Sequence, residues 1–206
     1  GVNVNKSNGT HTIYPIIEIL NRGFGEISEY RYELAWLLIE NGADLTVQQQ
    51  YETVPYSIVG VKISTYEDKF QQQSLDLMKY VIEQKVSLKA PDPTNSQSGN
   101  TEHYARYKIN EIIGMAARNN YVSVVEYFLE KGLYDVNDVV SLDGTTSLIQ
   151  AVQGDSYEVC ELLIEQGADI TVIDQNGKTA YDYAMENGNQ KIIDLFPHSI
   201  SAMNSM

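Results

Sequence analysis

The chain of 206 residues has a single cysteine, Cys160, which excludes an internal disulfide and a cysteine-rich zinc site. Basic side chains are also scarce, because 14 Lys and Arg stand against 28 Asp and Glu and give a net charge of −14. Such a surface repels phosphates, so we expect no nucleic-acid partner. The sequence has neither a signal peptide nor an apolar run long enough to cross a bilayer, so we expect no membrane insertion.

Residues typical of catalytic and metal sites are few and scattered. His11, His103 and His198 are far apart, and none has a second ligand at metal-binding spacing. Cys160 follows Val159 at an apolar position of an expected helix, where a thiol would be buried and unreactive. We therefore expect no catalytic residue, no metal and no cofactor, and a protein that is not an enzyme.

What the chain does contain is an internal repeat. One copy opens with Asp143-Gly144-Thr145 and the next with Asn176-Gly177-Lys178, which marks a period of about 33 residues. A fixed period of this size is the signature of stacked repeats, and such a stack offers an extended surface more readily than a closed pocket.

The first of these copies predicts two short helices. Thr146 stands just before a run with one-face apolar spacing and is expected to cap the first helix. Gly154 ends that helix, and the apolar residues of 159–164 predict the second. Gly167 is expected to end the second helix in a left-handed conformation, after which an extended loop, the finger, crosses to the next unit.

The second copy repeats this order. Thr179 with Asp182 three residues later predicts a capping box, in which each side chain accepts a hydrogen bond from the other's main chain. Gly188 marks the turn, and Pro197 stops the second helix. The polar tail, 198–206, is expected to fray.

Earlier segments fit the same template less closely. The pattern predicts helices within 112–131, a helix pair at 55–61 and 74–86, and a second helix at 34–40 closed by Gly42. Together the units place the order Gly-x-Thr, Ala-Ala, Val-Val-x-x-Leu-Leu and Gly-Ala-Asp along most of the chain.

This order resembles the ankyrin repeat, strongly over 141–196, well over 111–137 and in degenerate form over 4–90. The family's Thr-Pro-Leu-His is nowhere intact. At the place of its Pro stand Ser147, Ala180 and Ile112, and at the place of its His stand Ile149, Asp182 and Gly114. The hydrogen bonds that this His normally gives between fingers therefore have no obvious donor here.

The resemblance implies an all-α ankyrin-repeat solenoid of stacked helix-turn-helix units joined by finger loops. We expect a single domain over 1–197, followed by the tail 198–206. Its units would span about 4–47, 48–90, 106–140, 141–173 and 174–197, with insertions near 23–30, 62–73 and 90–104.

The resemblance also implies a non-enzymatic module that binds an unidentified protein through finger tips and the concave groove. Carried over by position, the finger candidates are Gln49, Gln50, Glu52, Tyr107, Lys108, Asn110, Leu142, Asp143, Thr145, Gln175, Asn176 and Lys178, and the first-helix candidates are Arg118 and Gln153. Tyr107 and Leu142 are the most informative about binding, because an apolar or aromatic side chain on a finger tip is not needed to stack the repeats. The alternative for Tyr107 is that it packs against the preceding insertion.

Two other functions stay open. The chain could be the regulatory or targeting segment of a larger enzyme or multidomain protein, or an array that only spaces other modules. It begins at Gly1 without a methionine, so we expect that upstream sequence was removed. We expect a monomer. The cytoplasm is favoured as its location, with secretion and the periplasm left open.

Overall fold

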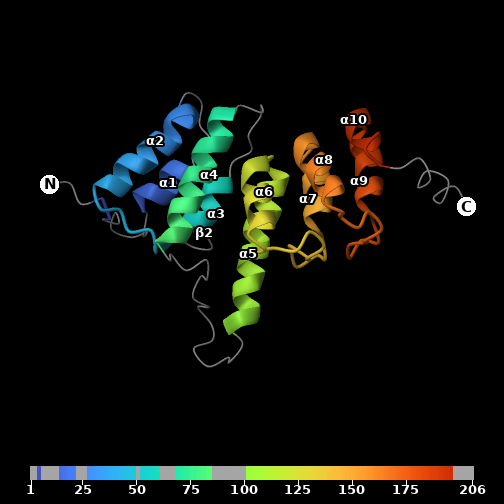
Figure 1. The fold of residues 1–206 in the computed structure, drawn as a ribbon, viewed down its shortest axis with the longest axis horizontal. Helices are drawn as coiled ribbons and strands as arrows, with labels where there is room; N and C mark the ends of the chain where they lie inside the picture. Colours follow the sequence, from blue (N-terminus) through green and yellow to red (C-terminus); the bar gives the residue numbers. More distant parts are fainter. Residues whose placement is uncertain are drawn as a thin grey trace, which may run out of the picture. The chain divides into compact units, whose positions relative to one another are not determined.

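The computed structural model of the chain describes residues 4–5, 14–21, 27–49, 52–60, 68–84 and 101–196, and only the main chain at 27–29, 48, 49, 52, 68 and 101–108. The described residues form an all-α fold, which confirms the predicted class, with ten helices and one short strand pair (Figure 1). The chain divides into two compact units, unit 1 (Gly1–Ile112) and unit 2 (Ile113–Met206).

Unit 1 contains two helix pairs. Its elements are α1 (Pro15–Asn21), α2 (Ile27–Glu40), β1 (Gln48–Gln49), β2 (Glu52–Thr53), α3 (Val54–Val59) and α4 (Asp68–Glu83). Helix α1 packs against α2 and α3, and α4 packs against α2 and α3. The core between them buries Leu20, Ala35 and Leu77 completely, together with Tyr32, whose hydroxyl donates to the carbonyl of Ile58 at 3.0 Å.

Unit 2 repeats this arrangement more regularly. Helix α5 (Thr101–Arg118) crosses the boundary between the units, and α6 (Val122–Glu130), α7 (Ser147–Gln153), α8 (Tyr157–Glu165), α9 (Ala180–Asn187) and α10 (Gln190–Ile193) follow. Helix α7 packs against α8 and α9, while α8 also packs against α6 and α10 (Figure 1). Val152, Val159 and Leu163 are fully buried between these helices.

The predicted helix starts are present. Thr146 caps α7, because its side chain accepts from the main-chain nitrogen of Ile149 at 3.4 Å. Thr179 and Asp182 form the predicted capping box on α9: Thr179 accepts from Asp182 N at 3.2 Å, and Asp182 accepts from Thr179 N at 2.8 Å. Each cap satisfies a main-chain donor that the first turn of a helix leaves free.

Residues with a left-handed backbone follow both first and second helices of the repeats. The second helix α8 is followed by Gly167, with φ of 84°, and the nitrogen of Ala168 donates to the carbonyl of Leu163 at 2.9 Å. The first helices α5 and α7 are instead followed by Asn120 and Asp155, with φ of 68° and 57°. Asn and Asp tolerate this conformation better than other residues with a side chain, so the chain reverses without glycine there.

Neighbouring repeats approach closely where α5 meets α7. A Cβ atom at Gly154 would lie 2.0 Å from the carbonyl oxygen of Arg118, so the position admits glycine alone without movement of the main chain. The hydroxyl of Ser156 donates to that same carbonyl at 2.9 Å. The end of α5 is therefore joined directly to the turn that follows α7 in the next repeat.

Asparagine side chains join the fingers. Asn137 accepts from the main-chain nitrogen of Asp169 in the next repeat at 2.7 Å. In unit 1, Asn5 accepts from the nitrogen of Asp44 at 2.7 Å and donates to the carbonyl of Gly42 at 2.9 Å. These joints connect fingers in a chain whose repeats lack the family's histidine.

Several helices begin earlier than the pattern predicted. Helix α2 begins at Ile27 and α4 at Asp68, both inside ranges expected as insertions, and α5 begins at Thr101 rather than near Ile112. The residues in front of each predicted start contain no proline or glycine that would prevent the helix from extending. The single domain over 1–197 and its unit limits stay predictions, and the tail 198–206 and Pro197 lie outside the described residues.

Two glycine substitutions separate conformational from steric constraint. Gly167→Ala should destabilise the fold by about 1 kcal/mol, because the position needs a left-handed backbone but has open space around it. Gly154→Ala should cost about 3 kcal/mol, because the new methyl group collides with the carbonyl of Arg118. Urea denaturation of both variants measures the two costs. Equal midpoints for Gly154→Ala and the unchanged chain would contradict the close approach.

Candidate functional site

A row of polar side chains crosses the first helices of unit 2. The guanidinium of Arg118 on α5 donates to the side-chain oxygens of Gln150 at 3.2 Å and Gln153 at 2.9 Å, both on α7. The amide nitrogen of Gln150 donates in turn to the hydroxyl of Thr145 at 2.8 Å. Side chains from two helices and one finger are thus held by direct hydrogen bonds.

The finger tip at 141–145 is built around one carboxylate. Asp143 accepts from the hydroxyl of Thr145 at 3.0 Å and from the hydroxyl of Ser141. Burial alone would raise the pKa of Asp143, but the hydrogen bonds from Ser141 and Thr145 outweigh it and hold that pKa below its ordinary value. The carboxylate therefore keeps its charge and fixes the tip.

A second carboxylate, Asp174, organises the next finger. It accepts from the hydroxyl of Tyr183 at 2.6 Å and from the main-chain nitrogens of Asn176 at 2.8 Å and Lys178 at 3.0 Å. Burial would raise the pKa of Asp174, yet these hydrogen bonds together lower it. Tyr183 also accepts from the side chain of Asn176 at 3.2 Å, so α9 and its finger are tied at two points.

Lys178 lies between α9 and this finger. Its ammonium group pairs with Glu186 at 2.7 Å and lies over the ring of Tyr183, 5.1 Å from the ring centre. The hydrogen bond with Glu186 is the main cause of a raised pKa of Lys178. Because the pair is exposed, it positions the side chains more than it stabilises the fold.

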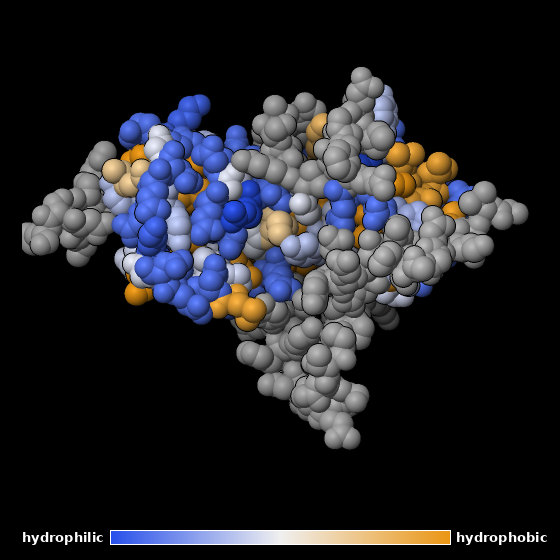
Figure 2. Space-filling model, turned by 180° about the vertical axis from the view of Figure 1, so that it is seen from behind, coloured by the Kyte–Doolittle hydropathy of each residue, from blue (hydrophilic) through white to orange (hydrophobic). Residues whose placement is uncertain are grey.

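Apolar side chains project from the same fingers. Leu142 is 80% exposed and Ile173 is 61% exposed. Gln175 braces the tip of Leu142, because its side chain donates to the carbonyl of Leu142 at 2.8 Å and its main-chain nitrogen donates to the carbonyl of Asp143 at 2.9 Å. Figure 2 shows a largely hydrophilic (blue) surface on unit 2, with separate apolar atoms (orange) along its lower edge.

The structure brings several predicted residues together. Arg118 contacts Gln153, and Leu142 contacts Gln175, while Asn176 is joined to Asp174, which was not predicted. Sequence reasoning missed Gln150 and Tyr183, which connect these contacts. One signal could have found them, since Tyr183 occupies the place in its repeat that Gln150 occupies in the preceding one.

Three expected placements were wrong, and a fourth residue, Thr145, lies on its expected finger but is not displayed. Tyr107, Lys108 and Asn110 lie within α5, not on a finger, because no proline or glycine interrupts the helix from Thr101 up to these residues. Thr145 is fully buried, because its hydroxyl is used inside the finger. Whether these residues contact a partner stays a prediction.

The finger of unit 1 is only partly described. Gln49 pairs with Glu52 across β1 and β2, which places both beside a tight hairpin. Gln50 lies outside the described residues, as do His11 and His198, and of His103 only the main chain is described.

The part of the chain that the structure describes contains no group of three or more His, Cys, Asp or Glu that could hold a metal ion. Cys160 is fully buried, as predicted, and burial raises the pKa of its thiol well above the ordinary value. None of the described helices is long and apolar enough to span a membrane.

Short antiparallel helix pairs, finger loops and left-handed turns define a helical repeat protein. Residues 113–204 match the family model for ankyrin repeats (3 copies). The chain therefore contains ankyrin repeats over these residues. Ankyrin repeats generally mediate protein binding, and only ankyrin repeats are detected in this chain.

The chain is 33% identical over 91 residues to FPV031 of fowlpox virus (strain NVSL), which is named as an ankyrin repeat protein; the match covers 42% of this chain and 26% of that one. It is 37% identical over 71 residues to ankyrin repeat and SAM domain-containing protein 6 of Rattus norvegicus, covering 34% and 8%. Ankyrin repeat protein OPG189 of monkeypox virus is 23% identical over 165 residues, covering 80% and 24%. The chain thus spans about a quarter of these relatives' length or less.

The lowered pKa of Asp174 predicts a specific loss of stability in acid. Because its folded pKa lies below the ordinary value of 3.8, Asp174 stabilises the fold above that pH and loses this contribution as the pH falls through the folded pKa. The melting temperatures of the unchanged chain and Asp174→Asn should therefore converge in acid. Thermal unfolding between pH about 6 and about 2 measures this, and curves that stay parallel would contradict the role of Asp174.

Proposed function

We propose that the chain is a non-enzymatic module that binds a segment of a partner protein through the fingers and first helices of unit 2. The observation that carries this proposal is the 80% exposed side chain of Leu142 on a finger tip that Gln175 braces. Leucine in such a place gains nothing for stacking, whereas burial under a partner would remove its surface from water.

The polar row supports the same function. Arg118, Gln153 and Lys178 are held by hydrogen bonds or an ion pair before any partner arrives. Ordering a side chain on binding costs about 0.5–1.5 kcal/mol, and side chains that are already held avoid part of that cost. Exposed Leu142 and Ile173 would supply apolar contact at the edge of this row.

The remaining finger candidates of unit 2 flank this surface. We propose Asp143, Gln175 and Asn176 as polar contacts, because all three are exposed on the fingers. Gln49 and Glu52 stay separate candidates on unit 1, since their hairpin is the finger of that unit.

A second function deserves an experiment of its own, because the relatives are about four times as long as the match or longer. In this alternative the chain is the regulatory or targeting segment of a larger enzyme or multidomain protein. The full-length coding sequence from the source organism separates the two readings. A catalytic domain in that sequence would favour the alternative.

The finger surface can be tested by paired substitution. Leu142→Ala with Ile173→Ala should reduce capture of a partner at least about tenfold, because two exposed apolar contacts are lost. Affinity capture from the source cell with quantitative mass spectrometry measures this. The folded state should be unchanged, since neither side chain is buried.

Glu130→Ala with Glu165→Ala is the matched control, because both side chains are exposed on second helices away from the fingers. This control should retain every captured partner. Equal capture by the finger variant and the unchanged chain would remove the support for the proposed surface.

A further inference from the structure

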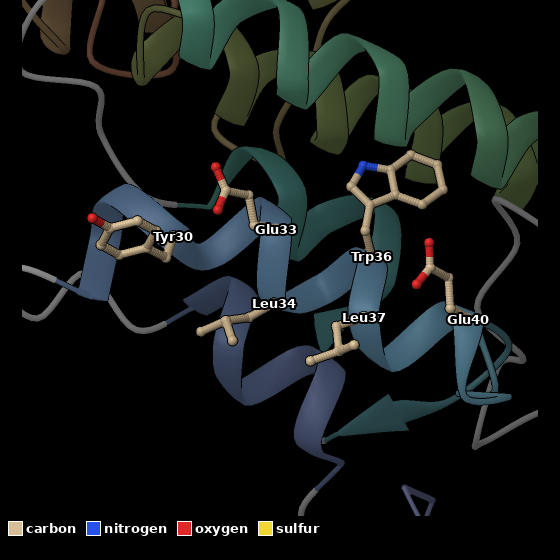
Figure 3. Close-up of a pocket in the computed structure, with 6 residues that line it drawn as sticks. All are labelled: Tyr30, Glu33, Leu34, Trp36, Leu37 and Glu40. Atoms are coloured by element: carbon tan, nitrogen blue, oxygen red, sulfur yellow. The ribbon is translucent and has the colours of Figure 1, made fainter.

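A shallow, largely open hollow of about 550 Å³ lies along helix α2 of unit 1. All the side chains that line it come from this one helix (Figure 3): Tyr30, Glu33, Leu34, Trp36, Leu37 and Glu40. A hollow of this size can accept large side chains of a partner.

One side of the hollow is apolar. Tyr30 is 50% exposed and Leu37 is 54% exposed, and the half-buried Leu34 lies between them at helical spacing. Leu34 and Leu37 point to the same side of α2 in Figure 3. The core contacts of the helix come from its opposite face, where Tyr32 and Ala35 are fully buried. Tyr30 and Leu37 therefore lie outside the buried core of the described part of unit 1.

The other side of the hollow is acidic and held in place. Trp36 points toward α4 and packs edge-on against Tyr80, with ring centres 5.0 Å apart (Figure 3). Glu33 lies 3.5 Å from the ammonium group of Lys69, and Glu40 is exposed one turn beyond Trp36. Two carboxylates thus flank an indole whose position is fixed.

We propose that this face of α2 is a docking site for a basic amphipathic helix of a protein partner. The strip from Tyr30 to Leu37 is about 10 Å long, which matches two turns of a partner helix with apolar residues at i, i+3 or i+4, and i+7. Lysine or arginine beside those residues would meet Glu33 and Glu40. Trp36 is also available to such cations, because a cation over an indole face is attracted to the ring.

Charge selects this occupant over others. A second copy of the chain would place Glu33 and Glu40 against carboxylates of the same kind, which is unfavourable. Anionic lipid or nucleic acid would be repelled by the net charge of −14. The site lies within unit 1 and does not depend on the finger surface of unit 2, so either proposal can fail without the other.

Trp36 provides a direct readout, because it is the only tryptophan of the chain. The probe is a tryptophan-free peptide of about 18 residues made of Leu, Lys and Ala, with Leu on one helical face. We expect the peptide to shift the emission of Trp36 in the full chain and to bind more weakly as salt is raised. An analogue of this peptide with Glu in place of Lys should leave the emission of Trp36 unchanged.

Two variants locate the site. Leu37→Glu should weaken binding at least about tenfold, because it places a charge within the apolar strip. Glu40→Lys should weaken binding of the lysine peptide by roughly threefold and strengthen binding of the glutamate analogue. Glu165→Lys is the matched control, since Glu165 is also the exposed last residue of a second helix.

Three outcomes would overturn the proposal. One is an unchanged Trp36 emission at saturating lysine peptide. Another is equal affinity for Leu37→Glu and the unchanged chain, with binding followed by a label on the peptide. The third is an effect of Glu165→Lys as large as that of Glu40→Lys, which would indicate general attraction to an acidic surface. Circular dichroism of each variant shows that it is folded.

Discussion

None of the helix pairs that the structure describes buries its apolar side alone, and the fold depends on the contact that each pair makes with its neighbours. In unit 2, α7 is covered by α8 and also by α9, and α8 lies against α6 and α10. The buried residues Val152 and Val159 therefore depend on helices from more than one repeat. Stability in such an array is close to a sum of repeat and interface contributions, so damage to one interface reaches the repeats on both sides.

Apolar stacking alone would allow repeats to slide, and polar joints fix their spacing. The carbonyl of Arg118 contacts the turn at Gly154 so closely that a methyl group does not fit between them. Asn137 holds the nitrogen of Asp169 at 2.7 Å, and Asn189 donates to Asp155 at 2.6 Å. The same joints fix the first helices and fingers, so the rigidity of the proposed binding surface follows from the way the repeats are stacked.

The sequence predicted the repeat class and the regular part of unit 2, because caps and left-handed turns are local. Thr146, Thr179 and Gly167 have the predicted roles, and each of them contacts or shapes only residues nearby in the sequence. The part of α5 before Ile112 was missed because a polar helix without strong apolar spacing resembles an inserted loop. Burial of Thr145 and the partnership of Tyr183 with Asp174 depend on contacts between segments, which single-sequence spacing does not contain.

The composition places one intrinsic probe in each unit. The single tryptophan, Trp36, lies in unit 1, and the single cysteine, Cys160, is fully buried in unit 2. A buried thiol reacts only when its surroundings open, so the rate of its alkylation follows local unfolding of unit 2. Indole fluorescence follows unit 1 over the same time. Without any substitution, the protein can thus show whether its two units unfold as one cooperative system or as two.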